Sequence, residues 1–269
     1  MPELPEVETT VKSLNILKNK KVINVDIHVK KLRYSVPVSD LKNLINHKIE
    51  TLRRISKYVI IDFDNSKSLI IHLGMSGRLK IIKFNTLLNK HDHLAIKFKT
   101  STLVFNDPRR FGFVDIVKSN ELSNTRYIQQ LGIDALDKKL SEDYLYNKFS
   151  KSEVLVKQLM LNQHIVAGIG NIYACEILYD AKISPLRKGS SLKKYHIGTI
   201  LKSIRKILKK AIKHGGSSIS DYVAPDGTLG NFQKNFKVYG RDGLKINGYE
   251  IKKMVLYGRS TFFCPKIQK

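Results

Sequence analysis

The spacing of hydrophobic residues changes near residue 130, and this change constrains the fold of the 269-residue chain more than any other feature. Before it, apolar residues alternate with mostly polar ones in short runs, as between Ile23 and Val29, which is the period of a half-buried strand. After it, apolar residues recur every three or four positions, as in amphipathic helices. The sequence therefore predicts an α+β protein, with a β-rich first part and a helical second part.

The first part has the pattern of a β-sandwich that follows one helix. Val7, Val11 and Leu14 recur at helical spacing directly after the amino terminus. Strand-like runs follow, separated by Gly, Asn and Asp, which is typical of a sandwich. These runs are Tyr58 to Phe63, Ser68 to Leu73, Arg78 to Ile82, Leu94 to Phe98, Leu103 to Phe105 and Phe113 to Val117.

The second part contains helices, then a loop, then a hairpin. Helical spacing marks the surroundings of Leu155 and the segment from Ile200 to Ala211, which Gly215 and Gly216 end. A loop rich in Ser, Gly and Asp follows. Asn247-Gly248 then indicates a two-residue hairpin turn. We expect a β-sandwich domain over residues 1–130, a helical domain over 131–231 and a terminal hairpin over 232–269.

The charge of the chain favours a polyanionic partner. Its 48 basic residues outnumber 23 acidic ones, which gives a net charge of +25 and leaves nucleic acid or an anionic membrane as partners. No apolar run is long enough to span a bilayer, and the amino terminus lacks the regions of a signal peptide. Cys175 and Cys264 do not form a disulfide framework. We therefore expect a soluble cytoplasmic protein.

The first residues combine a nucleophile with carboxylates. Removal of Met1 would leave Pro2 with a free secondary amine, which can attack a sugar carbon and form an iminium. An α-amino group titrates nearer neutrality than a lysine does, so more of it is unprotonated. Glu3 and Glu6 could transfer protons nearby. By itself, however, a proline at this position is also simply a good first residue of a helix.

Several motifs together give the chain a resemblance to a known family. The start Met1-Pro-Glu-Leu-Pro-Glu-Val-Glu8 resembles that of bacterial formamidopyrimidine-DNA glycosylases, the family shared with endonuclease VIII. Further blocks match in order and spacing along the whole chain, which makes a chance match improbable. They are Arg53 to Tyr58, His72 to Leu79, Asn106 to Gly112, Val166 to Ala174, Val238 to Arg241 and Gly258 to Pro265.

The resemblance implies a catalytic set. Pro2 would attack C1′ of a damaged nucleotide and expel the base, after which elimination of both flanking phosphates leaves a gap. Glu3 would be the general acid and base. Lys57 would bind phosphate beside the lesion and assist catalysis, and Glu6 would shape the site. Arg259 would complete the set from the terminal hairpin.

The resemblance also implies residues that hold DNA. Met75, Arg109 and Phe111 match a trio that fills the space left by the flipped nucleotide, where apolar wedges hold the stack apart and Arg109 donates to the orphaned base. Without the resemblance, Met75 and Phe111 would be read as core residues. Lys157 and Asn171 match phosphate-binding residues of a helix–two-turn–helix. Tyr239 and Arg259 match further phosphate contacts. Residues 217–228 match a lesion-recognition loop.

Neither histidines nor cysteines predict a metal site. His91 and His93 with one intervening aspartate are too few ligands, so we expect a pair at a strand end beside DNA. Most family members end in a four-cysteine zinc finger, whereas only Cys264 remains here. The sequence predicts a zincless hairpin and no cofactor. Candidates for its core are Ile246, Ile251, Val255, Leu256 and Phe262.

These features predict a monomeric base-excision repair enzyme that acts on double-stranded DNA. Its substrates would be 8-oxoguanine, formamidopyrimidines and abasic sites, with the DNA bent in a basic cleft between the domains and bound in a salt-dependent way. Alternatives are an endonuclease VIII-like enzyme for oxidised pyrimidines, a non-catalytic DNA-binding protein and an inactive glycosylase. An RNA-binding role has the least support, because no RNA-binding motif is present.

Overall fold

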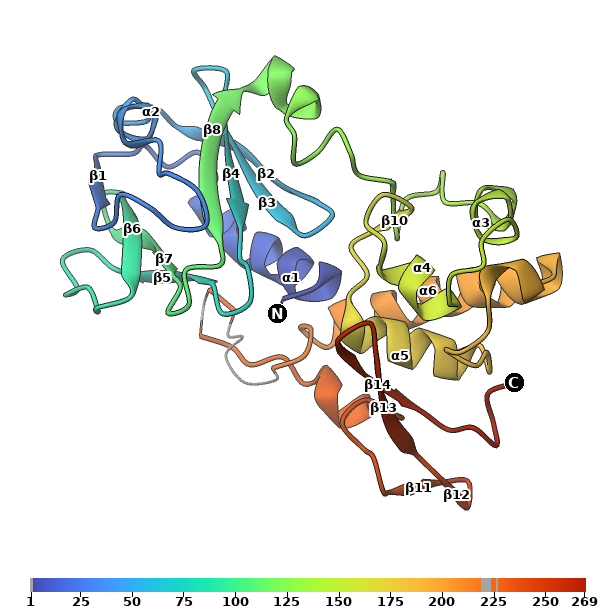
Figure 1. Ribbon diagram of the computed structural model, residues 1–269. Helices are drawn as coiled ribbons and strands as arrows, with labels where there is room; N and C mark the ends of the chain where they lie inside the picture. Colours follow the sequence, from blue (N-terminus) through green and yellow to red (C-terminus); the bar gives the residue numbers. More distant parts are fainter. Residues whose placement is uncertain (1, 219–223, 226) are drawn as a thin grey trace. The chain divides into compact units, whose positions relative to one another are not determined.

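A computed structural model describes residues 2–218, 224, 225 and 227–269 (Figure 1). The chain forms two compact units. The first comprises Met1–Gln129 and His214–Gln233, and the second comprises Gln130–Lys213 and Lys234–Lys269. The segment after the long helix of the second unit thus packs with the amino-terminal residues. Within the described residues, every helix is too short or too polar to cross a membrane.

Two four-stranded antiparallel sheets build the first unit (Figure 1). In the first sheet the strand order is β1 (Asn24–Ile27), β6 (Asp92–Lys97), β7 (Ser101–Asn106) and β5 (Arg78–Lys83). In the second sheet it is β2 (Ile49–Ile55), β3 (Tyr58–Phe63), β4 (Lys67–His72) and β8 (Phe113–Lys118). The N-terminal β-sandwich predicted from the alternating pattern is confirmed.

The central strands β3 and β4 of the second sheet are buried on both faces. Val59, Ile61, Leu69 and Ile71 enter the main core of the unit, whereas Ile60 and Ile70 face the opposite side. A smaller cluster covers that side and includes Phe113 and Leu122. Successive strand residues point to opposite faces, so two covered faces produce a continuous apolar run.

Helix α1 (Leu4–Leu14) covers this core with one face. Leu4, Val7, Val11 and Leu14 are buried, and the helix contacts β2 and β3. The remaining helical elements of this unit are short. They are η1 (Asn15–Leu17), α2 (Val38–Lys42), η2 (Ser119–Asn124) and part of η4 (Phe232–Asn235).

The second unit is helical. Its elements are β9 (Ile133–Asp134), α3 (Glu142–Phe149), α4 (Val156–Leu161), β10 (Val166–Ala167), α5 (Asn171–Asp180), η3 (Gly189–Ser191) and α6 (Lys194–Lys213). Helix α6 buries an apolar stripe and contacts α3 and α5. Helix α5 also contacts the terminal hairpin, so it is buried on two sides. The predicted helical domain is confirmed.

The carboxyl-terminal segment contains two hairpins rather than one. The predicted Asn247-Gly248 turn joins β11 (Lys245–Ile246) to β12 (Tyr249–Glu250), and both turn residues have positive φ, 50° and 81°. A second turn at Tyr257-Gly258 joins β13 (Lys252–Leu256) to β14 (Arg259–Phe263). The sequence did not indicate this turn, because a tyrosine rarely adopts the positive φ of 49° found here.

The predicted core of the hairpin is only partly correct. Ile251 and Phe262 are buried and pack with Cys175 and Val238, and Ile246 packs against them. Val255 was wrongly assigned to the core, since it is 68% exposed. It pairs with Ser260 near the turn, at the end of the hairpin farthest from the buried residues.

The last residues clamp the base of this hairpin. Gln268 is buried and accepts a hydrogen bond from the Cys264 amide (2.8 Å) while its own amide donates to the Ile183 carbonyl (2.9 Å). Backbone bonds join Lys269 to Lys182 and Ser184. One side chain therefore connects the end of β14 to the loop that follows α5.

Replacement of Gln268 by alanine should destabilise the protein by about 1–3 kcal/mol, because it leaves the buried Cys264 amide and Ile183 carbonyl unpaired. Urea unfolding measures this loss. Lys266→Ala changes a neighbouring exposed residue and serves as the matched control. Equal stabilities for the two variants would contradict the clamp.

Candidate functional site

The amino terminus is fixed at the start of α1. Pro2 is buried, and Glu3, which is 2% exposed, is the N-cap residue of the helix. The Glu3 side chain accepts from the Glu6 amide, and the Glu6 carboxylate accepts from the Glu3 amide (2.9 Å). This reciprocal capping box satisfies helix-start amides and sets the direction of the chain at Pro2 and Glu3.

The same Glu6 carboxylate binds a segment more than 200 positions away in the sequence. Its second oxygen accepts from the Ser217 amide (2.7 Å) and the Ser217 hydroxyl (3.0 Å), and Glu6 is 1% exposed. Gly216 allows this approach, because a Cβ atom there would lie 2.9 Å from the Glu6 oxygen. The sequence predicted Gly216 only as a helix end.

Lys57 lies in the tight turn between β2 and β3. Ser56 adopts a positive φ of 53°, and the Arg54 guanidinium donates to the Ser56 carbonyl (2.9 Å) and to the Glu8 carboxylate (2.8 Å). Glu8 belongs to α1, so this ion pair ties the turn to the helix that carries Pro2. Lys57 is 8% exposed and its position is therefore restricted.

His72 is a site residue that the sequence analysis did not single out. It ends β4 opposite Tyr58, and its ring stacks on Phe113. Burial lowers the His72 pKa from 6.5 to about 4, and the nearby charges of Lys57 and Arg33 add to the effect. The ring Nδ1 accepts from the Gly74 amide (3.1 Å), so the neutral ring carries its hydrogen on Nε2.

Asp107 joins the two loops that carry Met75 and Phe111. Its carboxylate is fully buried and accepts from the Ser76 hydroxyl (2.6 Å) and the Gly112 amide (2.7 Å). The Ser76 oxygen in turn accepts from the Arg109 amide (3.2 Å). No local sequence pattern indicates this role, because it depends on contacts between residues that are far apart in the chain.

The two loops touch at backbone level and expose their tips. Gly74 has a φ of +63°, and a Cβ atom there would lie 2.4 Å from the Gly112 nitrogen. Met75 and Phe111 are 43% and 46% exposed, and the Arg109 guanidinium lies 4.8 Å from the centre of the Phe111 ring. The three residues predicted to enter DNA are thus neighbours at a surface rather than core residues.

His91 and His93 have different environments. The His93 ring is buried and bonds to the Asp107 carbonyl (2.9 Å), whereas His91 is partly exposed. Asp92 between them binds Lys80 and Asn106. The described residues contain no group of three or more histidine, cysteine or carboxylate side chains placed to hold a metal ion.

In the second unit, Lys157 and Asn171 lie together and support the β13–β14 hairpin. The Lys157 ammonium donates to Asn171 Oδ1 (2.7 Å), Thr261 Oγ1 (2.6 Å) and the Ser260 carbonyl (3.2 Å), and Lys157 is 2% exposed. Asn171 Nδ2 also donates to the Ser260 carbonyl (2.9 Å). This cluster fixes the strand directly after Arg259, which is exposed.

Glu176 anchors the residues before the hairpins and was also missed. Its buried carboxylate accepts from three consecutive amides, those of Lys237, Val238 and Tyr239, at 2.8–2.9 Å. Burial raises the Glu176 pKa, although these hydrogen bonds oppose the shift. They fix the backbone at Tyr239, whose ring packs edge-to-face on Phe262 at a centroid distance of 5.0 Å.

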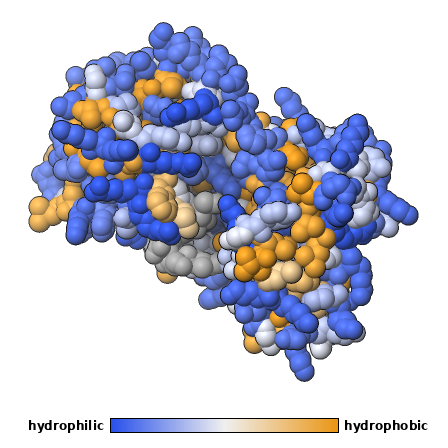
Figure 2. Space-filling view, in the orientation of Figure 1, coloured by the Kyte–Doolittle hydropathy of each residue, from blue (hydrophilic) through white to orange (hydrophobic). Residues whose placement is uncertain are grey.

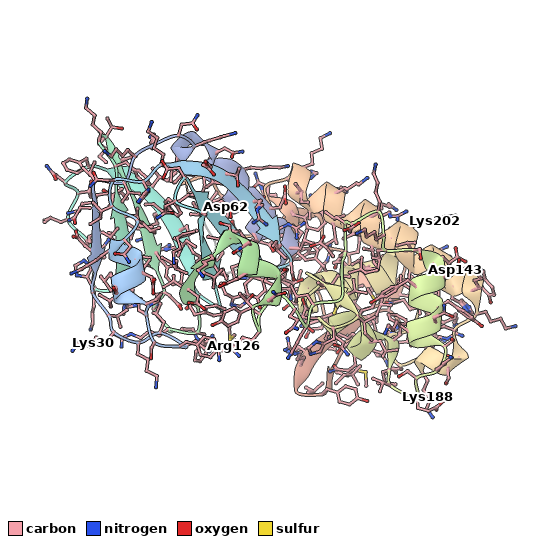
Figure 3. The ribbon with its side chains drawn as sticks, turned by 90° about the horizontal axis from the view of Figure 1, so that it is seen from above. Lys30, Asp62, Arg126, Asp143, Lys188 and Lys202 are labelled. Atoms are coloured by element: carbon pink, nitrogen blue, oxygen red, sulfur yellow. The ribbon has the colours of Figure 1, made fainter. Side chains whose placement is uncertain are left out.

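The surface carries an excess of positive charge. Twenty-three acidic residues can pair with fewer than half of 48 basic ones. Hydrophilic residues cover most of the face seen in Figure 2, and the side chains of Lys30, Arg126, Lys188 and Lys202 lie at the outside of their units (Figure 3). Each unit can therefore attract a polyanion.

Comparisons with known proteins give a consistent assignment. The family model of the formamidopyrimidine-DNA glycosylase N-terminal domain matches residues 1–114, and that of its H2TH domain matches residues 131–223. Formamidopyrimidine-DNA glycosylases from Zymomonas mobilis and Rickettsia canadensis are 44% and 40% identical over the whole of this chain. The chain belongs to the formamidopyrimidine-DNA glycosylase family.

Solved structures of this family share the fold. Lactococcus lactis Fpg in complex with DNA containing N7-benzyl-Fapy-dG matches with a TM-score of 0.93 and 34% identity, and its complex with abasic-site DNA matches with 0.92 and 33%. Both matches cover all of either chain. The resemblance inferred from the motifs is therefore confirmed.

One predicted feature of the family falls partly outside the described residues. The loop over residues 217–228, predicted to recognise the lesion, includes residues 219–223 and 226, which the structure does not describe. Of its described part, the Pro225 carbonyl accepts from the Ile81 amide (2.9 Å) and Ala224 bonds to Thr228. These bonds connect residues in the second half of the loop to each other and to β5.

Replacement of Asp107 by alanine should lower the free energy of unfolding by about 3 kcal/mol, because at least two buried donors lose their acceptor. Asp115→Ala is the matched control, because it removes a partly exposed carboxylate from β8, the strand that follows Asp107 along the chain. Urea unfolding of both variants provides the comparison. A loss no greater than that of the control would exclude a joining role for Asp107.

The buried neutral His72 predicts a dependence of stability on pH. Its folded pKa lies below the unfolded value, so stability is full above pH 6.5 and is lost as the pH falls towards about 4. Between about pH 7 and pH 5 this group should remove about 2 kcal/mol of stability. His72→Gln should flatten this slope in urea unfolding, and His28→Gln should not. Identical slopes in all three proteins would contradict the assignment.

Proposed function

We propose that this protein is a bifunctional DNA glycosylase and abasic-site lyase that removes oxidised purines from double-stranded DNA in base-excision repair. Its substrates are 8-oxoguanine, formamidopyrimidines and abasic sites. The observation that carries the proposal is the fixed Pro2-Glu3 start of α1 in a chain of the formamidopyrimidine-DNA glycosylase family. The Lactococcus lactis relatives are bound to DNA with a formamidopyrimidine lesion or an abasic site.

Pro2 is the proposed nucleophile. After removal of Met1, its nitrogen attacks C1′ of the damaged nucleotide, and the bond between C1′ and the base breaks with a proton delivered to the leaving base. Opening of the sugar ring gives an iminium. Loss of a proton from C2′ then expels the 3′ phosphate, a second elimination expels the 5′ phosphate, and water releases Pro2 from the remaining sugar fragment.

Carboxylates and cations assist this sequence in different ways. Glu3 adjoins Pro2 and transfers protons to and from the sugar. Glu6 acts through position, because its carboxylate holds the Glu3 amide and Ser217. Lys57 neutralises the phosphate beside the lesion, and the Nε2 hydrogen of neutral His72 donates a hydrogen bond to it. Arg259, which lies on the β13–β14 hairpin, binds a DNA phosphate.

The residues predicted to hold DNA divide into contacts and supports. Met75 and Phe111 enter the stack, and Arg109 donates to the base left without its partner. Asn171 keeps one amide hydrogen for a phosphate after donating to Ser260. Tyr239 and His91 provide further contacts. Lys157 supports Asn171 and Thr261, since its ammonium donates to protein acceptors.

We also propose that the enzyme works as a monomer in the cytoplasm and needs no metal ion or other cofactor. Cys175 and Cys264 are both buried and free, which suits a reducing compartment. The hairpin core around Ile251 and Phe262, together with the Gln268 and Glu176 contacts, supplies the support that zinc gives to other members.

Borohydride trapping on a duplex with 8-oxoguanine opposite cytosine tests the proposal. The wild type should form a covalent adduct, and Pro2→Gly should form about a hundredfold less, because it replaces the secondary amine. Glu3→Gln should retain the fold and lose base excision. Undiminished trapping by Pro2→Gly would move the nucleophile to another residue.

The same assay separates the substrate classes. A duplex with thymine glycol should be cut more slowly than one with 8-oxoguanine. Preferential cutting of thymine glycol would favour an endonuclease VIII-like enzyme. Binding without strand scission on either duplex would favour a non-catalytic DNA-binding protein.

A further inference from the structure

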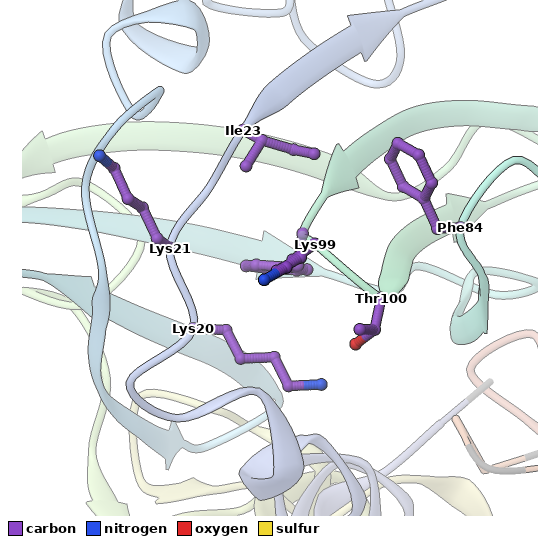
Figure 4. Close-up of a pocket in the computed structure, with 7 residues that line it drawn as sticks. Lys20, Lys21, Ile23, Phe84, Lys99 and Thr100 are labelled. Carbon is purple, nitrogen blue, oxygen red and sulfur yellow. The ribbon is translucent and has the colours of Figure 1, made fainter.

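A pocket in the first unit combines an apolar floor with a rim of lysines (Figure 4). Its volume is about 480 Å³, which is the size of small-ligand sites. It is lined by Lys20, Lys21, Ile23, Phe84, Phe98, Lys99 and Thr100. None of the site residues described above takes part in it.

Three separate segments bring these residues together. The Ile23 amide donates to the Lys97 carbonyl at the end of β6 (2.8 Å), and the Phe84 amide, after β5, donates to the Thr100 carbonyl (3.3 Å). Ile23 and Phe84 remain 44% and 37% exposed, whereas Phe98 is buried beneath them in the core. The floor is therefore an apolar surface that the chain leaves open to solvent.

The charged residues that line the pocket are all lysines. The segments that provide the lining, residues 9–25, 65–91 and 93–106, contain no aspartate or glutamate. The nearby Asp26 carboxylate pairs with Lys97 (2.7 Å), and Lys20 donates to the Ser101 hydroxyl (3.3 Å). Among the ion pairs of the described residues, none involves Lys21 or Lys99. The pocket lining itself therefore offers only positive charge to the carboxylates of a bound partner.

The pocket lies away from the DNA-contacting loops of its own unit. Strand β7 starts beside it at Ser101 and ends at Asn106, next to Asp107. Six strand residues span about 17 Å, so the pocket and the Met75 and Phe111 loops lie at opposite ends of β7. A ligand here can bind without competing for those loops.

We propose that this pocket binds an acidic peptide segment of a partner protein through one bulky apolar side chain. The apolar side chain would rest on Ile23, Phe84 and Phe98, and flanking carboxylates would pair with Lys20, Lys21 and Lys99. A phosphodiester backbone has no apolar group to place on this floor. The pocket also has no arginine and only one half-exposed aromatic ring, so a stacking platform for successive bases is absent from its lining.

Fluorescence anisotropy with the labelled peptide Asp-Glu-Asp-Leu-Phe tests the pocket in the full-length protein. The double variant Lys21→Glu and Lys99→Glu should weaken binding at least about tenfold. Lys138→Glu with Lys139→Glu makes the same charge change at exposed lysines elsewhere and should have little effect. Replacing the final Leu-Phe of the peptide by Ala-Ala should weaken its binding to the wild type about fivefold. The protein variant Phe84→Ala should weaken binding of the original peptide by a similar factor.

Three results would overturn the proposal. One is equal weakening by the two double variants, which would indicate attraction by net charge alone. Another is no peptide binding at concentrations up to about 1 mM. The third concerns the pocket variant, the double variant Lys21→Glu with Lys99→Glu. If this variant lost as much affinity for a single-stranded oligonucleotide as for the peptide, the pocket would be part of a nucleic-acid surface. Unchanged cutting of 8-oxoguanine DNA by the pocket variant verifies its fold and keeps this test separate from the proposed activity.

Discussion

The hydrogen bonds of the buried Glu6 carboxylate hold the amino terminus in place. One oxygen accepts from the Glu3 amide and the other from Ser217, so a single group fixes the first residues both to the start of α1 and to the segment after α6. A terminal amine is otherwise among the most mobile groups of a chain. A reaction at Pro2 needs a defined direction of attack, and this carboxylate provides it. The positive φ and missing side chain of Gly216 make the arrangement possible.

The same principle applies at the other parts of the site. Buried polar groups hold the backbone, and exposed residues nearby are left to make contacts. Asp107 joins two loops beneath Met75 and Phe111, and Lys157 fixes the strand that follows Arg259. Glu176 fixes the amides before Tyr239. Each buried group has several partners, because an unpaired polar group in such a position would cost about 1–3 kcal/mol.

Strong periodicity and local turn chemistry made much of the fold predictable. The runs from Tyr58 to Phe63 and from Phe113 to Val117 match β3 and β8, and Asn247-Gly248 forms the expected turn. Strand β2 was missed because Glu50, Arg53 and Arg54 interrupt its apolar pattern, and Arg54 is there to bind Glu8. Motifs located Lys57 and Asn171, but not the roles of Asp107, His72 and Glu176. Those roles depend on partners from distant parts of the sequence, which no local pattern specifies. For the same reason the motifs did not indicate that the Lys157 ammonium donates to Asn171, Thr261 and Ser260, and its contact with phosphate stays a prediction.

Catalysis by Pro2 depends on a free secondary amine at the first position of the mature chain. Mass spectrometry of the purified, fully active protein tests this most directly, by intact mass and by sequencing of the amino-terminal peptide. We predict that Met1 is absent and that Pro2 is unmodified in the active molecules. Retention of Met1, or a blocked Pro2 nitrogen, in a preparation that cuts lesion DNA at its full rate would contradict it.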